Sequence, residues 1–430
     1  MFSHSWLRAL VQARRPGHSL AQPFYTSKAV FDAEMDLIFA SHWIYVGVEP
    51  DVAEPGDMVT VALGPASVLI LRGHDGVIRA FHNVCRHRGA RLIDEPQSQA
   101  MHLTCRYHGW TYGLDGALKF ANHMAEDFDK SCHGLKAVAI RSVAGLLFIC
   151  LADDPPSDFD DMSAIMTPYL APHDIAGCKV AHAEDTIEQG NWKLTMENNR
   201  ECYHCAANHP ELMHPLYAFG FGYAPSKDNL REAQEEAQYR DRVADAAKTW
   251  DAAGLPHALV EDLHDRPTGY RTERLVIAGA GESQTLDTKV ASQKLLGAFT
   301  DRALGGLSFW TQPNSWHHFM SDHIVSIAAI PLAPDRTLVR TKWLVAKTAV
   351  EGQDYTVENL TRVWRATNHQ DGALVEMVQR GAADPAYEAG PYSTFTEGLV
   401  DQFVTWYTRR MLAGLAESSP DDLGPTGSHP

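Results

Sequence analysis

The stretches HNVCRHRGARL, residues 82–92, and LTCRYHGWTYGLDG, residues 103–116, decide the fold of the first part of this chain. In the first stretch a cysteine precedes a histidine by two positions, and in the second by three. Two thiolates and two imidazoles on two loops suit either a tetrahedral zinc ion or a two-iron two-sulfur cluster in which histidines replace two cysteines on one iron. The candidate ligands are Cys85, His87, Cys105 and His108.

Short antiparallel strands are predicted around these two loops. Residues 58–84 alternate in polarity and are rich in β-branched side chains, with turn signals at two points, which is typical of a meander. The pattern ends with the apolar run VAGLLFICLA at 143–152, which is too short to span a membrane and predicts a buried strand. The polar, acidic and proline-containing stretch 152–161 is the predicted domain boundary.

Beyond this boundary the pattern mixes helices and strands, which indicates an α+β domain. Helices are predicted at 156–170, 192–208, 227–252, 355–381 and 397–416. Strands are predicted near 179–188, 306–311, 323–332 and 336–346. The sequence has no glycine-rich phosphate loop, so a nicotinamide cofactor would have to bind to another protein.

Composition narrows the class of protein. A chain of 430 residues can form two or so domains, and its 45% apolar and 21% charged residues are ordinary for a globular protein. The net charge of −17 argues against nucleic acid or an anionic membrane surface as a partner. Seven cysteines, an odd number, predict a cytoplasmic protein without a disulfide scaffold. The first 31 residues lack Asp and Glu, and we interpret them as a basic arm rather than a targeting segment.

A second metal-binding pattern is NNRECYHCAANHP at 198–210. Its cysteines and histidines could bind zinc, whereas its histidines and glutamate could instead belong to an oxygen-activating iron site. Pro210 disfavours the α conformation at the preceding residue, so a helix is predicted to end at His209 and turn that side chain inward. The residues concerned are Glu201, Cys202, His204, Cys205 and His209.

The first pattern, with its flanks HNVCRHRG and CRYHGWTY, resembles the Rieske iron–sulfur motif, C-x-H followed by C-x-x-H. The resemblance implies that Cys85 and Cys105 hold one iron of a two-iron two-sulfur cluster. It implies that His87 and His108 hold the other iron and stay partly accessible to solvent. Zinc motifs of this spacing lack those flanking residues, which disfavours the zinc alternative.

Two further segments, NWKLTMENNRECYH at 191–204 and NHQDGALVEMVQRG at 368–381, resemble the iron-binding segments of Rieske non-haem iron oxygenase α subunits. The resemblance implies a mononuclear ferrous iron. The implied ligands of that iron are His204, His209 and Asp371. Glu201 would then conduct electrons from a Rieske histidine of one subunit to an iron-binding histidine of the next. Cys202 and Cys205 are interpreted as small buried packing residues.

The same resemblance predicts an α+β protein in which an N-terminal all-β Rieske iron–sulfur domain precedes a larger catalytic domain. The catalytic domain is expected to be helix-grip-like, with helices flanking an antiparallel sheet. The predicted divisions are an N-terminal arm and helix at 1–40, the Rieske domain at 41–155, the mononuclear iron domain at 156–416 and a flexible tail at 417–430. A homotrimer or a hexamer is implied, because in this family the cluster of one chain serves the iron of its neighbour.

Similarity is strongest to the branch of the family that oxidises quaternary ammonium compounds. It implies an O2-dependent monooxygenase that hydroxylates an N-methyl group, which then leaves as formaldehyde. Glycine betaine is the first candidate substrate, and stachydrine or carnitine is the next. A separate flavin and iron–sulfur reductase would supply electrons from NADH or NADPH. Two alternatives stay open: hydroxylation of a non-cationic aromatic ring, and electron transfer or metal binding without oxygenase activity.

Aromatic side chains are the expected surroundings of the substrate. A trimethylammonium group donates no hydrogen bonds, and proteins hold it against aromatic faces. The predicted pocket residues are Trp316, Phe319, Tyr217 and Phe219. The histidines at 317, 318 and 323 are expected to be structural or to act as hydrogen-bond donors in the pocket.

Overall fold

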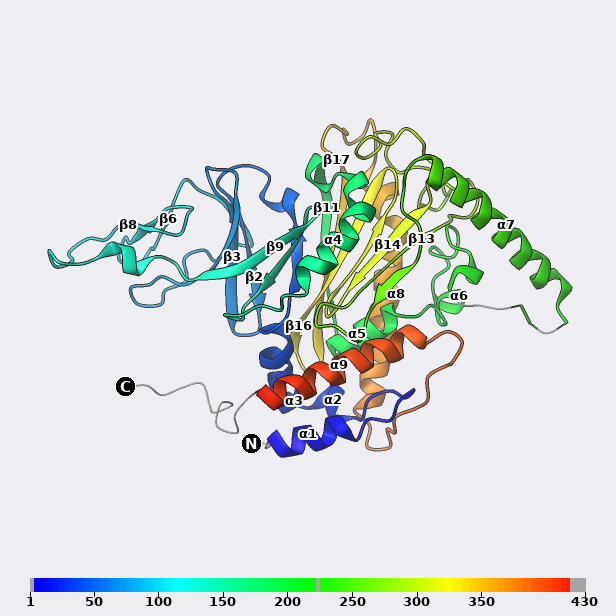
Figure 1. Ribbon diagram of the computed structural model, residues 1–430, viewed down its shortest axis with the longest axis horizontal. Helices are drawn as coiled ribbons and strands as arrows, with labels where there is room; N and C mark the ends of the chain where they lie inside the picture. The colour runs from blue at the N-terminus through cyan, green and yellow to red at the C-terminus, as the bar shows by residue number, and fades with distance from the viewer. Residues whose placement is uncertain (1–3, 222–224, 227, 418–430) are drawn as a thin grey trace.

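Two seven-stranded antiparallel sheets organise the chain (Figure 1). The computed structural model describes residues 4–221, 225–226 and 228–417. The first sheet has the order β1-β10-β9-β4-β3-β2-β5, and a small sheet, β6-β7-β8, extends beyond it. The strands are β1 Ile44–Val48, β2 Asp57–Leu63, β3 Ala66–Arg72, β4 Ile78–His82, β5 Gln97–Gln99, β6 Leu103–Thr104, β7 Thr111–Tyr112, β8 Leu118–Phe120, β9 Ala137–Val143 and β10 Leu146–Cys150.

The second sheet has the order β11-β17-β16-β15-β14-β13-β12. Its strands are β11 Cys178–Glu188, β12 Val260–Asp262, β13 Tyr270–Leu275, β14 Gly306–Thr311, β15 Ser315–Phe319, β16 His323–Ala333 and β17 Arg336–Ala346. The four strands predicted here are present, but β12, β13 and β15 were not predicted. In β15 every residue is buried, so the sequence lacks the alternation in polarity that reveals a half-exposed strand.

Helices cover the second sheet, and the helices at the two ends of the chain pack against each other (Figure 1). They are α1 His4–Gln12, α2 Pro23–Thr26, α3 Lys28–Glu34, α4 Phe159–Leu170, α5 Trp192–Asn199, α6 Cys205–Asn208, α7 Leu230–Ala252, α8 Val357–Ala382 and α9 Gly398–Glu417. Helix α8 contacts β11 and α5, and α1 contacts α9. The tail predicted at 417–430 lies, from residue 418 onward, outside the described residues. Within the described part of the chain, every helix is too short or too polar to cross a bilayer.

The single helix predicted at 192–208 is wrong, because residues 200–204 separate α5 from α6. Two consecutive asparagines, Asn198 and Asn199, end α5, and asparagine is a poor helix former. The N–H of Arg200 then donates to the carbonyl of Glu197 and closes the last turn of α5. The expected helix end before His209 is confirmed, since this residue leaves the α conformation at the end of α6.

A buried ion pair fixes the start of α5. Lys193 Nζ lies 2.6 Å from Glu34 Oε1, and both side chains are fully buried. Trp192 Nε1 donates to the other oxygen of Glu34 at 2.8 Å, and Tyr407 OH donates to Oε1 at 2.6 Å. These contacts satisfy both charges, as a buried pair requires. They tie α3 and α9 to α5, and therefore position the segment that follows α5.

One hydrogen bond and one glycine allow α5 and α8 to pack closely. The backbone N–H of Asn191 donates to Gln379 Oε1 at 2.9 Å. A Cβ atom on Gly190 would lie 2.4 Å from Cγ1 of Val375, so only glycine allows α8 to approach this closely. Two segments distant in sequence, 191–209 and 368–381, are thereby brought side by side.

Candidate metal centres and the cavity beside the histidine–aspartate triad

The first candidate site lies on two loops that are built alike. Loop 85–90 follows β4, and loop 105–110 joins β6 to β7. In each loop the cysteine N–H donates to the carbonyl five residues on, at 2.8 Å. The glycine N–H donates back to the cysteine carbonyl, at 3.0 and 2.9 Å. Gly89 and Gly109 have the same φ of 74°, in the left-handed region that favours glycine.

These loops place two thiols inside and two imidazoles outside. Cys85 and Cys105 are each 2% exposed, whereas His87 and His108 are exposed. The Nδ1 atoms of the two histidines lie 3.1 Å apart, and Tyr112 OH lies 3.2 Å from Cys85 Sγ. Burial raises the pKa of the Cys105 thiol. The four side chains fit a cluster with its cysteine-bound iron buried and its histidine-bound iron accessible.

The second candidate site joins two histidines of one segment to an aspartate of α8. His204 Nε2 lies 3.0 Å from His209 Nε2, and Asp371 Oδ1 lies 3.3 and 3.0 Å from these two atoms. Asp371 Oδ1 is buried and has no hydrogen-bond partner. Perpendicular bonds of about 2.1 Å to one metal ion place neighbouring ligand atoms about 3 Å apart. The three residues therefore fit a two-histidine, one-carboxylate iron site.

Charge within this triad favours a cation. Burial lowers the pKa of His204, but its contacts with Asp371 and Glu201 outweigh burial and raise the pKa to about 9. Burial also lowers the pKa of His209, but its contacts with Asp371 outweigh this effect and leave the pKa above its usual value. Burial raises the pKa of Asp371, but its contacts with the two histidines bring it below the usual range. In the absence of metal a proton balances the carboxylates, and a bound metal ion can take its place.

Partners on the opposite ring nitrogens orient both histidines. Glu201 Oε1 lies 2.5 Å from His204 Nδ1. Gln370 Oε1 lies 2.8 Å from His209 Nδ1, and Gln370 Nε2 donates to Glu211 Oε2 at 2.8 Å. These bonds fix the tautomers and direct each Nε2 atom inward. Gln370 and Glu211 were not predicted; the only signal in the sequence is that Gln370 stands next to Asp371.

Gln370→Leu is expected to weaken iron binding about 10- to 100-fold, because it removes the hydrogen bond that orients His209. Iron retained after dialysis against a graded series of chelator concentrations measures the effect. Gln370→Glu keeps an acceptor for His209 and should retain more iron than Gln370→Leu. Equal retention in Gln370→Leu and the wild type would contradict this role.

Cys202 and Cys205, interpreted from the sequence as small buried packing residues, are joined by a disulfide. Both are buried, as expected. The turn between α5 and α6 brings their Cα atoms to 4.9 Å, within the range that a disulfide spans. A disulfide leaves no thiolate for zinc, so the zinc alternative for residues 198–210 loses two of its ligands.

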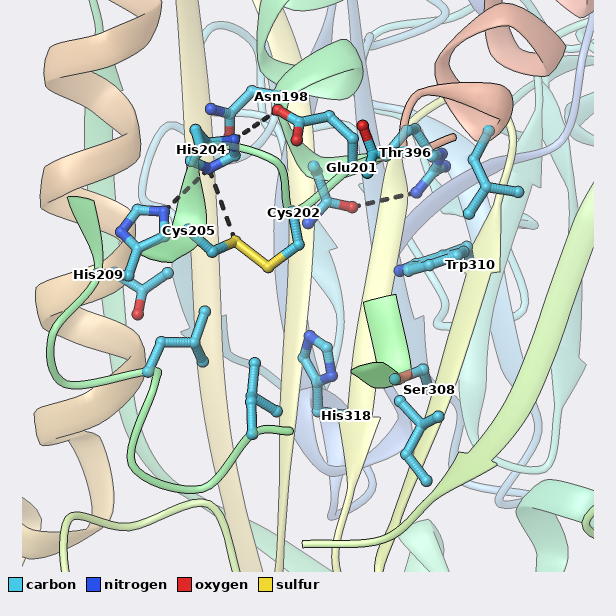
Figure 2. Close-up of a pocket in the computed structure, with 18 of the residues that line it drawn as sticks. Asn198, Glu201, Cys202, His204, Cys205, His209, Ser308, Trp310, His318 and Thr396 are labelled. Carbon is cyan, nitrogen blue, oxygen red and sulfur yellow. Dashed lines mark hydrogen bonds and ion pairs between the residues drawn. A yellow bond between two sulfur atoms is a disulfide. The ribbon is translucent and has the colours of Figure 1, made fainter. Parts of the chain in front are cut away.

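A cavity of about 320 Å³ adjoins the triad (Figure 2). His204, His209 and the disulfide form one wall, and Ser308, Trp310 and His318 of the sheet face them in Figure 2. The aromatic residues that line the cavity are Trp310, Trp364, Phe395 and His318. The ring of His318 stacks on Trp364 at 4.0 Å, and both of its nitrogens lack hydrogen-bond partners.

The four predicted pocket aromatics do not line this cavity. Trp316 and Phe319 are buried in the hydrophobic core on β15. Tyr217 and Phe219 instead pack against Tyr239 of α7. On β15 the cavity is lined by His318; Phe319 lies on the opposite face of the strand, and Trp316, although on the same face as His318, packs in the core. Because every residue of β15 is buried, the sequence does not show which of them reach the cavity. His317 and His323 are structural, as expected, with hydrogen bonds to serines.

The fold and the two centres define a Rieske-type iron oxygenase. Residues 177–413 match the protein family described as "Ring hydroxylating alpha subunit (catalytic domain)", and residues 42–139 match the family described as "Rieske [2Fe-2S] domain". The chain belongs to this family of Rieske oxygenase α subunits, whose cofactors are the two-iron two-sulfur cluster and a mononuclear iron.

Relatives support this assignment across nearly the whole chain. The chain is 43% identical over 413 residues to the glycine betaine monooxygenase oxygenase subunit of Chromohalobacter salexigens, covering 96% of this chain and 90% of the relative. It is 40% identical to the protein of that name from Pseudomonas aeruginosa, covering 95% and 93%. A quaternary ammonium Rieske monooxygenase solved with L-carnitine shares the fold, with a TM-score of 0.66, 23% identity and coverage of 94% and 98%.

Proposed function

We propose that this chain is the oxygenase component of a Rieske monooxygenase that removes an N-methyl group from a quaternary ammonium compound. Glycine betaine is the first candidate, and stachydrine or carnitine is the next. The observation that supports this most is the similarity over nearly full length to glycine betaine monooxygenase oxygenase subunits. A cavity of small-molecule size beside the histidine–aspartate triad is consistent with it.

In this proposal Cys85, His87, Cys105 and His108 hold the cluster, and His204, His209 and Asp371 hold the mononuclear iron. Iron at the triad supplies the activation of O2. The chain itself orients both imidazoles and holds the substrate in the cavity. The overall reaction takes an N-methyl group, O2, two electrons and two protons to an N-hydroxymethyl group and water. The N-hydroxymethyl product then loses formaldehyde and a proton, which leaves a tertiary amine.

Electrons are proposed to come from a separate flavin and iron–sulfur reductase and to enter at the exposed His108. Figure 1 places β6, at the start of the second cluster loop, at the opposite end of the molecule from α6. This separation favours transfer from the cluster of one subunit, through Glu201, to the iron of its neighbour. A homotrimer, alone or paired as a hexamer, would provide that contact.

Mixed oligomers test this route. Chains with Cys85→Ala lack a complete cluster, and chains with His204→Ala lack a complete iron site. Neither should turn over alone, but co-expressed chains should regain activity, because an intact cluster then faces an intact iron in a neighbour. Persistent inactivity of mixed oligomers that contain both metal centres would favour transfer within one chain.

The substrate is tested by formaldehyde release. The oxygenase, a surrogate reductase and NADH are incubated with glycine betaine, carnitine, stachydrine and naphthalene in turn. We expect formaldehyde in amounts matching O2 consumed with glycine betaine, and little with naphthalene. Ring hydroxylation releases no formaldehyde, so O2 consumption with the aromatic compound alone would favour the ring-hydroxylating alternative.

A further inference from the structure

Arg200 is a fully buried cation that no acidic side chain of the described residues neutralises. It lines the cavity beside the triad. Its Nη1 donates to Asn199 Oδ1 at 3.1 Å and its Nη2 to Gln312 Oε1 at 3.3 Å, both neutral amides. Its Nε is buried without a hydrogen-bond partner. Burial, and then repulsion from Arg271, lower the pKa of Arg200 to about 9, so the group is still charged at neutral pH.

The neighbouring Arg271 provides a contrast. It also lines the cavity, but it forms ion pairs with Glu261 and Glu273. The guanidinium carbons of Arg200 and Arg271 lie 5.3 and 5.4 Å from the centroid of the Trp310 ring. The charge of Arg271 is balanced by these glutamates, one of which, Glu273, also lines the cavity, whereas Arg200 keeps its positive charge beside the ring. This end of the cavity therefore suits an anion.

Further unused donors lie beside Arg200. Trp310 Nε1 and Gln312 Nε2 are buried and, like Arg200 Nε, have no hydrogen-bond partner. Figure 2 shows the indole nitrogen of Trp310 directed into the cavity. Buried N–H groups are costly when unpaired. A carboxylate accepts several hydrogen bonds and carries the negative charge that would neutralise Arg200.

The cavity also has an aromatic lining that, among the described residues, carries no unpaired cation. Stacked His318 and Trp364 offer ring faces, and the pKa of His318, lowered to about 3 by burial, keeps that ring neutral. A small molecule with a cationic head and an anionic tail matches both ends.

We propose that Arg200, assisted by the Trp310 indole N–H, binds the carboxylate of a zwitterionic quaternary ammonium substrate. The cavity thereby selects carboxylate-bearing substrates over simple cations such as choline. This inference rests on the proposed function and narrows its substrate class to betaines. Arg200 acts as a binding residue, and it holds the N-methyl group toward the triad.

Ligand binding to the wild-type oxygenase gives the first test. Calorimetry is done on protein with both metal centres loaded and without reductase, so that no turnover occurs. Glycine betaine should bind, and 3,3-dimethylbutanoate, its carbon isostere that keeps the carboxylate, should compete with it. Choline and the methyl ester of glycine betaine should bind at least about 10-fold more weakly. Equal affinity for choline, the ester and glycine betaine would overturn the proposal.

Variants give the second test. Arg200→Gln should weaken glycine betaine binding about 10- to 100-fold and leave choline binding unchanged. Arg200→Lys should be intermediate, because lysine keeps the charge but loses the planar fork. Arg274→Lys is the matched control, because Arg274 is also buried with an unpaired nitrogen but does not line the cavity. In this variant the ratio of glycine betaine affinity to choline affinity should stay at the wild-type value. Iron content and cluster absorbance verify that each variant is folded.

The outcomes separate the two proposals. Absence of formaldehyde release by the wild type from any quaternary ammonium compound would sink the proposed function. The carboxylate site alone would be contradicted if the wild type releases formaldehyde from glycine betaine while Arg200→Gln keeps the wild-type ratio of glycine betaine affinity to choline affinity. If Arg200→Gln does not fold, the analogue series on the wild type and Arg200→Lys still decide the question.

Discussion

Asp371→Ala is expected to reduce the iron content from about three to about two atoms per chain and to bring substrate oxidation down to background. The carboxylate oxygen of Asp371 lies 3.0 and 3.3 Å from the two imidazole nitrogens and has no other partner. Alanine leaves two histidines, which are too few ligands to hold ferrous iron in place. Metal analysis and the visible absorbance of the cluster should show that only the mononuclear iron is lost.

Glu376 offers a matched control on the same helix, α8. Its nearest charged partner is Arg380, 4.0 Å away, and it does not line the cavity. Glu376→Ala should therefore keep about three irons per chain and normal formaldehyde release. If Asp371→Ala also kept three irons and full activity, the histidine–aspartate triad would not be the iron site.

With both metal centres loaded from excess ferrous iron, Glu201→Ala is expected to lower turnover per bound iron about 100-fold or more. The carboxylate of Glu201 bonds to His204 Nδ1, on the side of the ring away from Asp371. Alanine removes both the partner that orients this ring and the proposed link to the neighbouring cluster. Single-turnover experiments measure the effect: the cluster is reduced beforehand, mixed with O2 and substrate, and followed by its absorbance.

Two comparisons separate electron transfer from iron binding. Glu201→Asp keeps a carboxylate on a shorter side chain and should recover part of the rate. Gln370→Leu disturbs the other histidine, so it should lower iron content while keeping the rate of cluster oxidation per bound iron close to normal. Cluster oxidation at the wild-type rate in Glu201→Ala would exclude this glutamate from the electron route.

Most secondary structure follows from local patterns in the sequence. The meander at 58–84 and the strands at 179–188, 306–311, 323–332 and 336–346 appear close to where alternation and β-branched residues predict them. Strand β15 was missed because burial on both faces removes the alternation. The helix at 192–208 was predicted as one element, whereas two asparagines end α5 and residues 200–204 separate it from α6.

The ligand sets differ in how far local sequence determines them. Each cysteine–histidine pair of the cluster lies within a single tight loop, so its spacing and flanking residues identify it from local sequence. The iron triad could be completed only through resemblance to a family, because Asp371 stands far along the chain from His204 and His209. Packing of α8 against α5 brings the carboxylate to the histidines.

By itself, the sequence determined which side chains can bind metal and where most strands and helices run, since both depend on neighbours a few positions away. The tertiary structure alone decided which aromatic rings face the cavity, that Cys202 meets Cys205, and that Arg200 is buried without an anion. Those features depend on which surfaces two sheets and α8 bury against one another, and spacing along a single chain does not encode that.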